Sequence, residues 1–272
     1  MTPGATIPIM RTPRPKRRRP PIEAGNPVWL FDLDNTLHHA SHAIFPAINT
    51  AMTQYIIDAL QVDHAEADRL RTSYTQRYGA ALLGLARHHP IDPHDFLKVV
   101  HTFPDLRTML RSERGLARLV AALPGRKIVL TNGPQAYAQA VLEELRIERL
   151  FERVIAVEHM RDRRGWRAKP DPAMLRRAMR DAHVRPADAI LVEDTRGHLK
   201  RYKRLGIRTV WIVGHLPSRP RADGSPARLP GTGRPHYVDR RIRSLKSLRL
   251  GNRSARLKGR QTCSRFASMT RP

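Results

Sequence analysis

The chain has 272 residues, 40% of them hydrophobic, which suits one large domain with a real core, with or without an insertion. Its 50 Lys and Arg against 24 Asp and Glu give a formal charge of +26. The single cysteine, Cys263, excludes an intramolecular disulfide framework and a Cys-rich zinc site. No apolar run reaches the ~20 residues that span a membrane, and no apolar segment follows the N-terminal arginines. The Arg-rich, acid-poor N-terminus also fits an organellar transit peptide, but its prolines argue against the amphipathic helix of such peptides. A cytoplasmic protein with no membrane partner is therefore expected.

The positive charge is concentrated towards the two ends of the chain. Residues 1–25 carry a net +5 and residues 216–272 a net +13, which leaves +8 for the middle. Residues 1–25 and 251–272 are predicted to be basic disordered tails, and 216–235 a Pro- and Gly-rich loop. Such tails could bind nucleic acid, so a nucleic-acid-associated protein remains an alternative of another class. Tails that are only solvated are favoured over tails that bind nucleic acid, because the chain has no basic strand with interspersed aromatic residues and no recognisable DNA-reading helix.

A short apolar run near the N-terminus ends in two carboxylates. Residues 28–31 read Val-Trp-Leu-Phe, as in a buried strand, and Asp32, Asp34 and Thr36 follow directly. Two carboxylates this close repel one another unless something neutralises them, and a hard cation such as Mg²⁺ does so in many proteins. Taken alone, the pattern also fits a strand that ends in a polar turn.

The next 80 residues show only helical periodicity. Apolar residues recur at three- and four-residue spacing over 44–60, a second helix is predicted over 64–86, and a third over 93–101. A crossover between parallel strands needs little more than a dozen residues. The excess predicts an inserted all-helical cap over residues 38–120.

Strands then alternate with helices. Strands are predicted at 128–130, 154–157, 189–192 and 209–213, with a last strand at 237–238; helices are predicted at 135–149, 172–182 and 196–205, with a short one near 245–248. This rhythm predicts an α/β fold, a Rossmann-like parallel sheet with helices on both faces, built from residues 26–37 and 121–250. Trp29 and Trp211 are expected in its core.

Polar residues stand where the predicted strands end. Ligands bind outside the carboxyl ends of parallel strands, and Asp32, Thr131 and Asp194 each follow or end a strand. Lys169 precedes a Pro-Asp-Pro helix start. Such a group suits phosphoryl transfer, because one carboxylate can attack phosphorus while a lysine and a threonine hydroxyl hold the other oxygens. Singly, these residues also fit a surface lysine, a helix N-cap and a turn.

Four segments together resemble the haloacid dehalogenase-like hydrolases. They are Asp32-Leu33-Asp34-Asn35-Thr36, Leu130-Thr131-Asn132-Gly133, Lys169-Pro170-Asp171-Pro172 and Val192-Glu193-Asp194-Thr195. They occur in the order and spacing of that family, and the resemblance covers about residues 26–250.

The resemblance implies a Mg²⁺-dependent phosphatase with a role for each segment. Asp32 would be the nucleophile that forms an aspartyl-phosphate, and Asp34 the general acid and base. Thr131 and Lys169, with Asn132, would bind phosphate. Asp32, Asp34 through its carbonyl, Asp194 and secondarily Glu193 would hold the metal. The presence of Asp34 argues against a dehalogenase, because those members lack the second aspartate.

The predicted cap bears on the substrate. Residues 77–85 read Arg-Tyr-Gly-Ala-Ala-Leu-Leu-Gly-Leu and, with His88-His89-Pro90-Ile91-Asp92, resemble pyrimidine 5'-nucleotidase-like members. This implies a pyrimidine nucleoside 5'-monophosphate as substrate, with Tyr78 contributing to specificity. The alternatives are a phosphatase of another small metabolite, a sugar phosphate or phosphoglycolate, and a Tyr78 that only ends a helix. The pairs His38-His39 and His88-His89 are expected on the cap surface or the substrate rim.

Overall fold

A computed structural model of the chain describes residues 26–216 and 233–249. The tails predicted at 1–25 and 251–272, Cys263 and most of the loop predicted at 216–235 lie outside the described residues.

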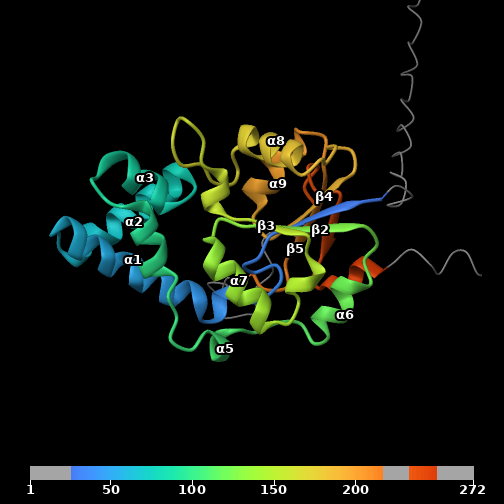
Figure 1. Cartoon of the computed structure of the whole chain (residues 1–272), viewed down its shortest axis with the longest axis horizontal. Coiled ribbons are helices and arrows are strands. Elements are labelled where there is room, and N and C mark those ends of the chain that lie inside the picture. The colour runs from blue at the N-terminus through green and yellow to red at the C-terminus, as the bar shows by residue number, and fades with distance from the viewer. Residues whose placement is uncertain (1–25, 217–232, 250–272) are drawn as a thin grey trace, which may run out of the picture. The chain divides into compact units, whose positions relative to one another are not determined.

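A parallel sheet of six strands forms the framework (Figure 1). In spatial order the strands are β3 (Arg153–Ile155), β2 (Arg126–Leu130), β1 (Val28–Phe31), β4 (Ala189–Glu193), β5 (Arg208–Ile212) and β6 (Arg240–Ile242). All five neighbouring pairs are parallel. Strands β1 and β4 are buried at every position, as apolar runs covered on both faces require. The Rossmann-like α/β prediction is confirmed.

Helices cover both faces of the sheet, because successive side chains of each strand point to opposite sides. Trp29 and Phe31 pack in one core cluster with residues of α6 (Leu116–Ala121) and α7 (Gln135–Glu144). Val28 and Leu30 pack in a second cluster with residues of α8 (Pro172–Asp181) and α9 (Arg196–Lys203). Figure 1 shows α6 and α7 below the sheet as drawn, and α8 and α9 above it. Trp29 and Trp211 are both buried, as predicted.

A group of helices lies between β1 and β2 in the chain and packs around its own apolar cluster. It contains α1 (Ile44–Leu60), α2 (His64–Tyr78), α3 (Ala81–His88) and α4 (Pro93–Val100), with a 3-10 turn at Ala40–His42 before it and α5 (Leu106–Met109) after it. The single helix predicted over 64–86 is two helices, because Gly79 at φ +90° ends α2 in a left-handed cap. That the cap extends over residues 38–120 stays a prediction. Helix α6, at the C-terminal end of this range, packs in one cluster with residues of the sheet.

Three 3-10 turns complete the described residues, at Glu148–Leu150, Val157–Met160 and Leu245–Arg249. The last strand was predicted at 237–238, but those residues belong to a turn in which the Val238 amide donates to the Pro235 carbonyl, and β6 starts at residue 240. Among the described residues, no helix combines the length and the apolarity needed to cross a bilayer.

Candidate active site

The three central strands bring the predicted site residues to one edge of the sheet. Asp32 follows β1 directly, Thr131 follows β2, and Glu193 is the last residue of β4. Strand β1 lies between the other two, with Phe31 in register with Val129 on one side and Val192 on the other. The three strands therefore end level, and the polar residues after them meet.

Lys169 joins two of these carboxylates. Its Nζ donates to Asp32 Oδ1 over 2.5 Å and to Glu193 Oε2 over 2.9 Å, and its side chain is only 1% exposed. Asn132 fixes the backbone of Lys169, because its Oδ1 accepts from the Lys169 amide over 2.7 Å and its Nδ2 donates to the Lys169 carbonyl. An ammonium group this deeply buried requires such anionic partners.

The ionisation of the three groups reflects burial and mutual charge. Burial would lower the pKa of Lys169, but Asp32 and Glu193 outweigh burial and raise it. Burial and the charge of Glu193 raise the pKa of Asp32 to about 6, although Lys169 opposes the shift. Burial would raise the pKa of Glu193 too, but Lys169 and His198 reverse the direction and lower it. Lys169 thus favours the anionic form of Asp32, whereas burial and Glu193 disfavour it.

Asp34 is held by the side chains of Tyr137 and His38. Its Oδ1 accepts a hydrogen bond from the Tyr137 hydroxyl over 2.6 Å and one from His38 Nε2 over 3.0 Å. Burial raises the pKa of Asp34, but these hydrogen bonds and the nearby His38 outweigh burial, and the net shift is downward. Asp34 is thereby fixed in orientation beside Asp32.

The threonines of the site are also bonded. Thr36 Oγ1 donates to Asp32 Oδ2 over 3.0 Å. Thr131 Oγ1 accepts from the Gly133 amide over 2.9 Å, which orders the turn after β2. The threonine predicted to bind phosphate thus lies buried at the end of β2, two residues before the backbone amide it holds.

An acidic cluster suits a hard cation. One carboxylate oxygen from each of Asp32, Glu193 and Asp194 lies within 4.8 Å of the others. Burial and the charges of Glu193 and Asp32 raise the pKa of Asp194 well above its usual range, a repulsion that a bound cation would relieve. Glu193 has the most partners of the three, since its two oxygens accept from Lys169 and from the Thr195 amide and its Oε2 also lies 3.1 Å from His198 Nδ1. An all-oxygen set of carboxylates fits Mg²⁺.

Tyr78 lies apart from these carboxylates. It ends α2, its hydroxyl is 2.6 Å from His88 Nε2, and it lines a cleft that none of the residues named above for catalysis, phosphate or metal enters. A role of Tyr78 in substrate choice stays a prediction.

The sequence placed His38 wrongly and missed Tyr137. His38 was expected on the surface or the rim, but it is completely buried, because Asp34, four residues earlier, needs a donor inside the protein. A histidine next to an Asp-x-Asp-x-Thr strand end was the available signal. Tyr137 had no such signal, because 103 residues separate it from Asp34.

Comparison with known proteins agrees with this geometry. A family model described as haloacid dehalogenase-like hydrolase matches residues 28–213. The chain is 26% identical over 201 residues to phosphate metabolism protein 8 of Saccharomyces cerevisiae. This aligned region covers 69% of this chain and 62% of that protein. It is 30% identical over 99 residues to phosphoglycolate phosphatase 1 of Pseudomonas aeruginosa, which covers 36% of this chain and 35% of that protein. The chain thus spans less than two thirds of the length of either relative.

Solved structures show the same fold. CbbY of Rhodobacter sphaeroides in complex with phosphate superposes with a TM-score of 0.56 at 21% identity, over 82% of this chain and 96% of that one. A HAD phosphatase of Thermococcus onnurineus gives a TM-score of 0.55 at 18% identity, with the same coverage. The chain belongs to the haloacid dehalogenase-like hydrolases, as the four sequence segments indicated.

Proposed function

We propose that the protein is a Mg²⁺-dependent phosphatase that hydrolyses a small phosphomonoester through an aspartyl-phosphate on Asp32. The observation that carries the proposal is the pair of aspartates at the end of β1. Lys169 and Thr36 fix Asp32, whereas Tyr137 and His38 fix Asp34. Two neighbouring carboxylates with separate sets of partners can take separate roles.

The first step transfers the phosphoryl group to the protein. A carboxylate oxygen of Asp32 bonds to phosphorus while the bond from phosphorus to the leaving oxygen breaks, and Asp34 gives that oxygen a proton. The dianionic substrate raises the pKa of Asp34 as it binds, which favours the protonated form that this step needs. Lys169 and the hydroxyl of Thr131 would stabilise charge on the other phosphoryl oxygens.

The second step frees the phosphate. Asp34, now a carboxylate, takes a proton from a water molecule whose oxygen bonds to phosphorus, and the bond to Asp32 breaks. Asp32, Asp194 and the carbonyl of Asp34, with Glu193 next to them, would hold Mg²⁺, which supplies positive charge against the phosphoryl oxygens when bound.

For the substrate we propose a pyrimidine nucleoside 5'-monophosphate, on the resemblance of residues 77–92 to the nucleotidase-like subgroup. Phosphoglycolate is the second candidate, because the name of a relative with 30% identity specifies it. A sugar phosphate is the third. The cytoplasmic location stays a proposal from the sequence.

A panel of phosphate esters tests the proposal. Phosphate release is measured from UMP, CMP, AMP, sugar phosphates and phosphoglycolate, with Mg²⁺ and with EDTA. We expect turnover only with the metal and highest kcat/KM for a pyrimidine nucleotide. Asp32→Asn, checked for an unchanged melting temperature, should show no turnover and no trapped phosphoenzyme. Near wild-type turnover by a folded Asp32→Asn protein would refute covalent catalysis by this residue.

A further inference from the structure

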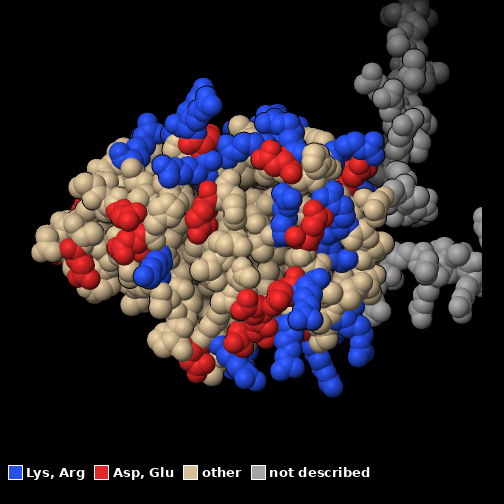
Figure 2. All heavy atoms as spheres, viewed as in Figure 1, with Lys and Arg blue, Asp and Glu red and all other residues tan. Residues whose placement is uncertain are grey.

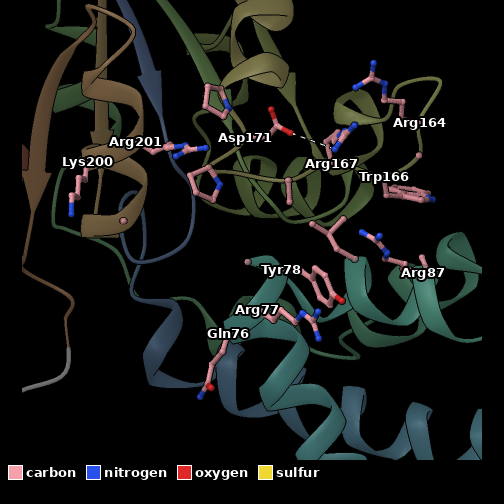
Figure 3. Close-up of a pocket in the computed structure, with 18 of the residues that line it drawn as sticks. Gln76, Arg77, Tyr78, Arg87, Arg164, Trp166, Arg167, Asp171, Lys200 and Arg201 are labelled. Atoms are coloured by element: carbon pink, nitrogen blue, oxygen red, sulfur yellow. Dashed lines mark ion pairs between the residues drawn. The ribbon is translucent and has the colours of Figure 1, made fainter.

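A cleft of about 1030 Å³ opens beside the catalytic group (Figure 3). Three elements form its walls: residues 76–87 at the end of α2 and in α3, the loop 164–168 with the start of α8, and the exposed side of α9 from Gly197 to Arg204. Its volume is close to the upper limit for small-molecule sites, which lie between about 300 and 1,000 Å³.

Basic side chains dominate the walls of this cleft. Seven Lys and Arg residues line it against one acid, Asp171, and they are Arg77, Arg87, Arg164, Arg167, Lys200, Arg201 and Arg204. Asp171 is already engaged, because it caps α8 and lies 3.8 Å from Arg167, which also pairs with Asp162. The other six cations are exposed and form no ion pair within residues 26–216 and 233–249. So much uncompensated like charge favours an anion from solution.

The cations come from separate parts of the fold. Figure 3 shows Arg77 and Arg87 on the α2 and α3 side, Arg164 on the loop, and Lys200 and Arg201 on α9, around one space. Figure 2 shows Lys and Arg gathered along the edge of the molecule that α3 and α8 occupy. An anion that reaches both sides would link the helical group to the sheet.

The cleft is distinct from the catalytic group. The Lys169 side chain turns inward to Asp32 and Glu193, whereas Pro170, the next residue, lines the cleft. Gly79 packs against this backbone segment, since a Cβ there would lie 3.3 Å from the Lys169 carbonyl oxygen. The two sites therefore lie on opposite sides of one backbone segment.

We propose that this basic cleft is a second ligand site, which binds a compact anion carrying two or more phosphoryl groups. Guanidinium groups bind phosphate oxygens through paired hydrogen bonds, so cations on three walls match several phosphoryl groups held close together. Nucleic acid is disfavoured, because the cleft has walls on three sides and Trp166 already packs 5.0 Å from His94 and 5.9 Å from Arg161.

Binding of inorganic tripolyphosphate tests the proposal. Titration calorimetry of the full chain in EDTA should show one site. Lys200→Gln with Arg204→Gln should raise Kd about tenfold or more, because two phosphate-binding cations are lost. The matched control is Arg176→Gln with Arg180→Gln, which lie four residues apart on α8, are exposed, and do not line the cleft. It should change Kd less than about twofold.

A second pair of variants tests the other wall. Arg87→Ala on α3 should weaken tripolyphosphate binding, whereas Lys98→Ala, an exposed cation on α4 outside the cleft, should not. With Mg²⁺, turnover of p-nitrophenyl phosphate by these variants should match the wild type, which separates this site from Asp32. Equal weakening by the control variants would show a diffuse charge effect and overturn the proposal. Parallel loss of turnover, or binding only of single-stranded oligonucleotides that tightens with their length, would overturn it as well.

Discussion

Asp34 accepts both of its side-chain hydrogen bonds on Oδ1, from Tyr137 and His38, and no described residue donates to Oδ2. One oxygen is therefore fixed while the other is available to carry a proton. Lys169 shows the opposite arrangement, since its single Nζ serves two different carboxylates. The first arrangement suits proton transfer, and the second suits charge stabilisation.

Replacing Asp34 should separate the two proposed chemical steps. Asp34→Asn keeps the backbone carbonyl and loses the proton carrier, so turnover should fall by ~10²–10⁴-fold. p-Nitrophenyl phosphate needs less protonation as it leaves, so it should recover part of the phosphorylation rate. Hydrolysis of the intermediate should stay slow, and phosphoenzyme should accumulate in rapid-quench experiments. A variant with equal losses for good and poor leaving groups would argue against proton donation by Asp34.

His101 should make the stability of the protein depend on pH. Burial lowers its pKa from 6.5 to about 4. Between pH 6.5 and about 4, His101 is protonated in the unfolded chain but neutral in the folded protein. The free energy of unfolding therefore falls as the pH falls through this range. The slope contributed is at most about 1.4 kcal/mol per pH unit.

Urea unfolding at several pH values measures this effect against His101→Gln. The variant lacks the titrating group, so the stability difference between wild type and variant should shrink as the pH falls. A difference that stays constant from neutral pH down to pH 4 would assign the loss to other groups.

At the scale of elements, α2 and α3 pack so closely that only glycine fits at one position. A Cβ on Gly84, within α3, would lie 2.2 Å from Tyr74 Cγ on α2. Tyr74 cannot easily move, because its hydroxyl lies 2.8 Å from His89 Nε2 and its ring stacks on His88. The contact explains a glycine in the middle of a helix, where it is otherwise unfavourable.

Gly84→Ala should therefore destabilise the protein. The gain in helix propensity is about 1 kcal/mol, whereas overpacking costs about 1–3 kcal/mol, so the melting temperature should fall. Gly197→Ala is the matched control, because nothing lies within 4 Å of a Cβ at this position in α9. That variant should melt at or above the wild-type temperature. Equal effects at the two glycines would contradict close packing of α2 on α3.

At the scale of the molecule, residues 25–250 hold every residue proposed for catalysis, from Asp32 to Asp194. They form one compact unit, and the family match lies inside it. The fragment 25–250 should therefore fold, with a melting temperature and a kcat close to those of the full chain. Loss of turnover in a folded fragment would give the terminal segments a part in catalysis.

The same fragment tests the nucleic-acid alternative. Binding to single- and double-stranded DNA is titrated with salt for the full chain and for residues 25–250. Tight, steeply salt-dependent binding by the full chain alone would favour that alternative, because each neutralised phosphate releases counterions. Weak binding by both would leave the phosphatase as the proposal.

Local pattern was enough for the sheet and for the motifs. Apolar runs of three or four residues, which are followed by Asp32, Thr131 and Glu193, indicate buried parallel strands and the edge where they end. Boundaries were less certain: the break at Gly79 requires a left-handed backbone, and β6 begins three residues later than the apolar pair Tyr237-Val238 suggested. Both boundaries depend on contacts with residues distant in the chain, which the pattern of apolar residues does not show.

The sequence by itself determined the α/β class, the family and the residues proposed for catalysis, because those depend on short segments with strong local preferences. Only the tertiary structure decided which groups hold these residues. Tyr137 reaches Asp34 across 103 positions, and the basic cleft joins residues 76–87 to 197–204. Such partners come together through the packing of distant elements, and no periodicity or spacing in the chain encodes that packing locally.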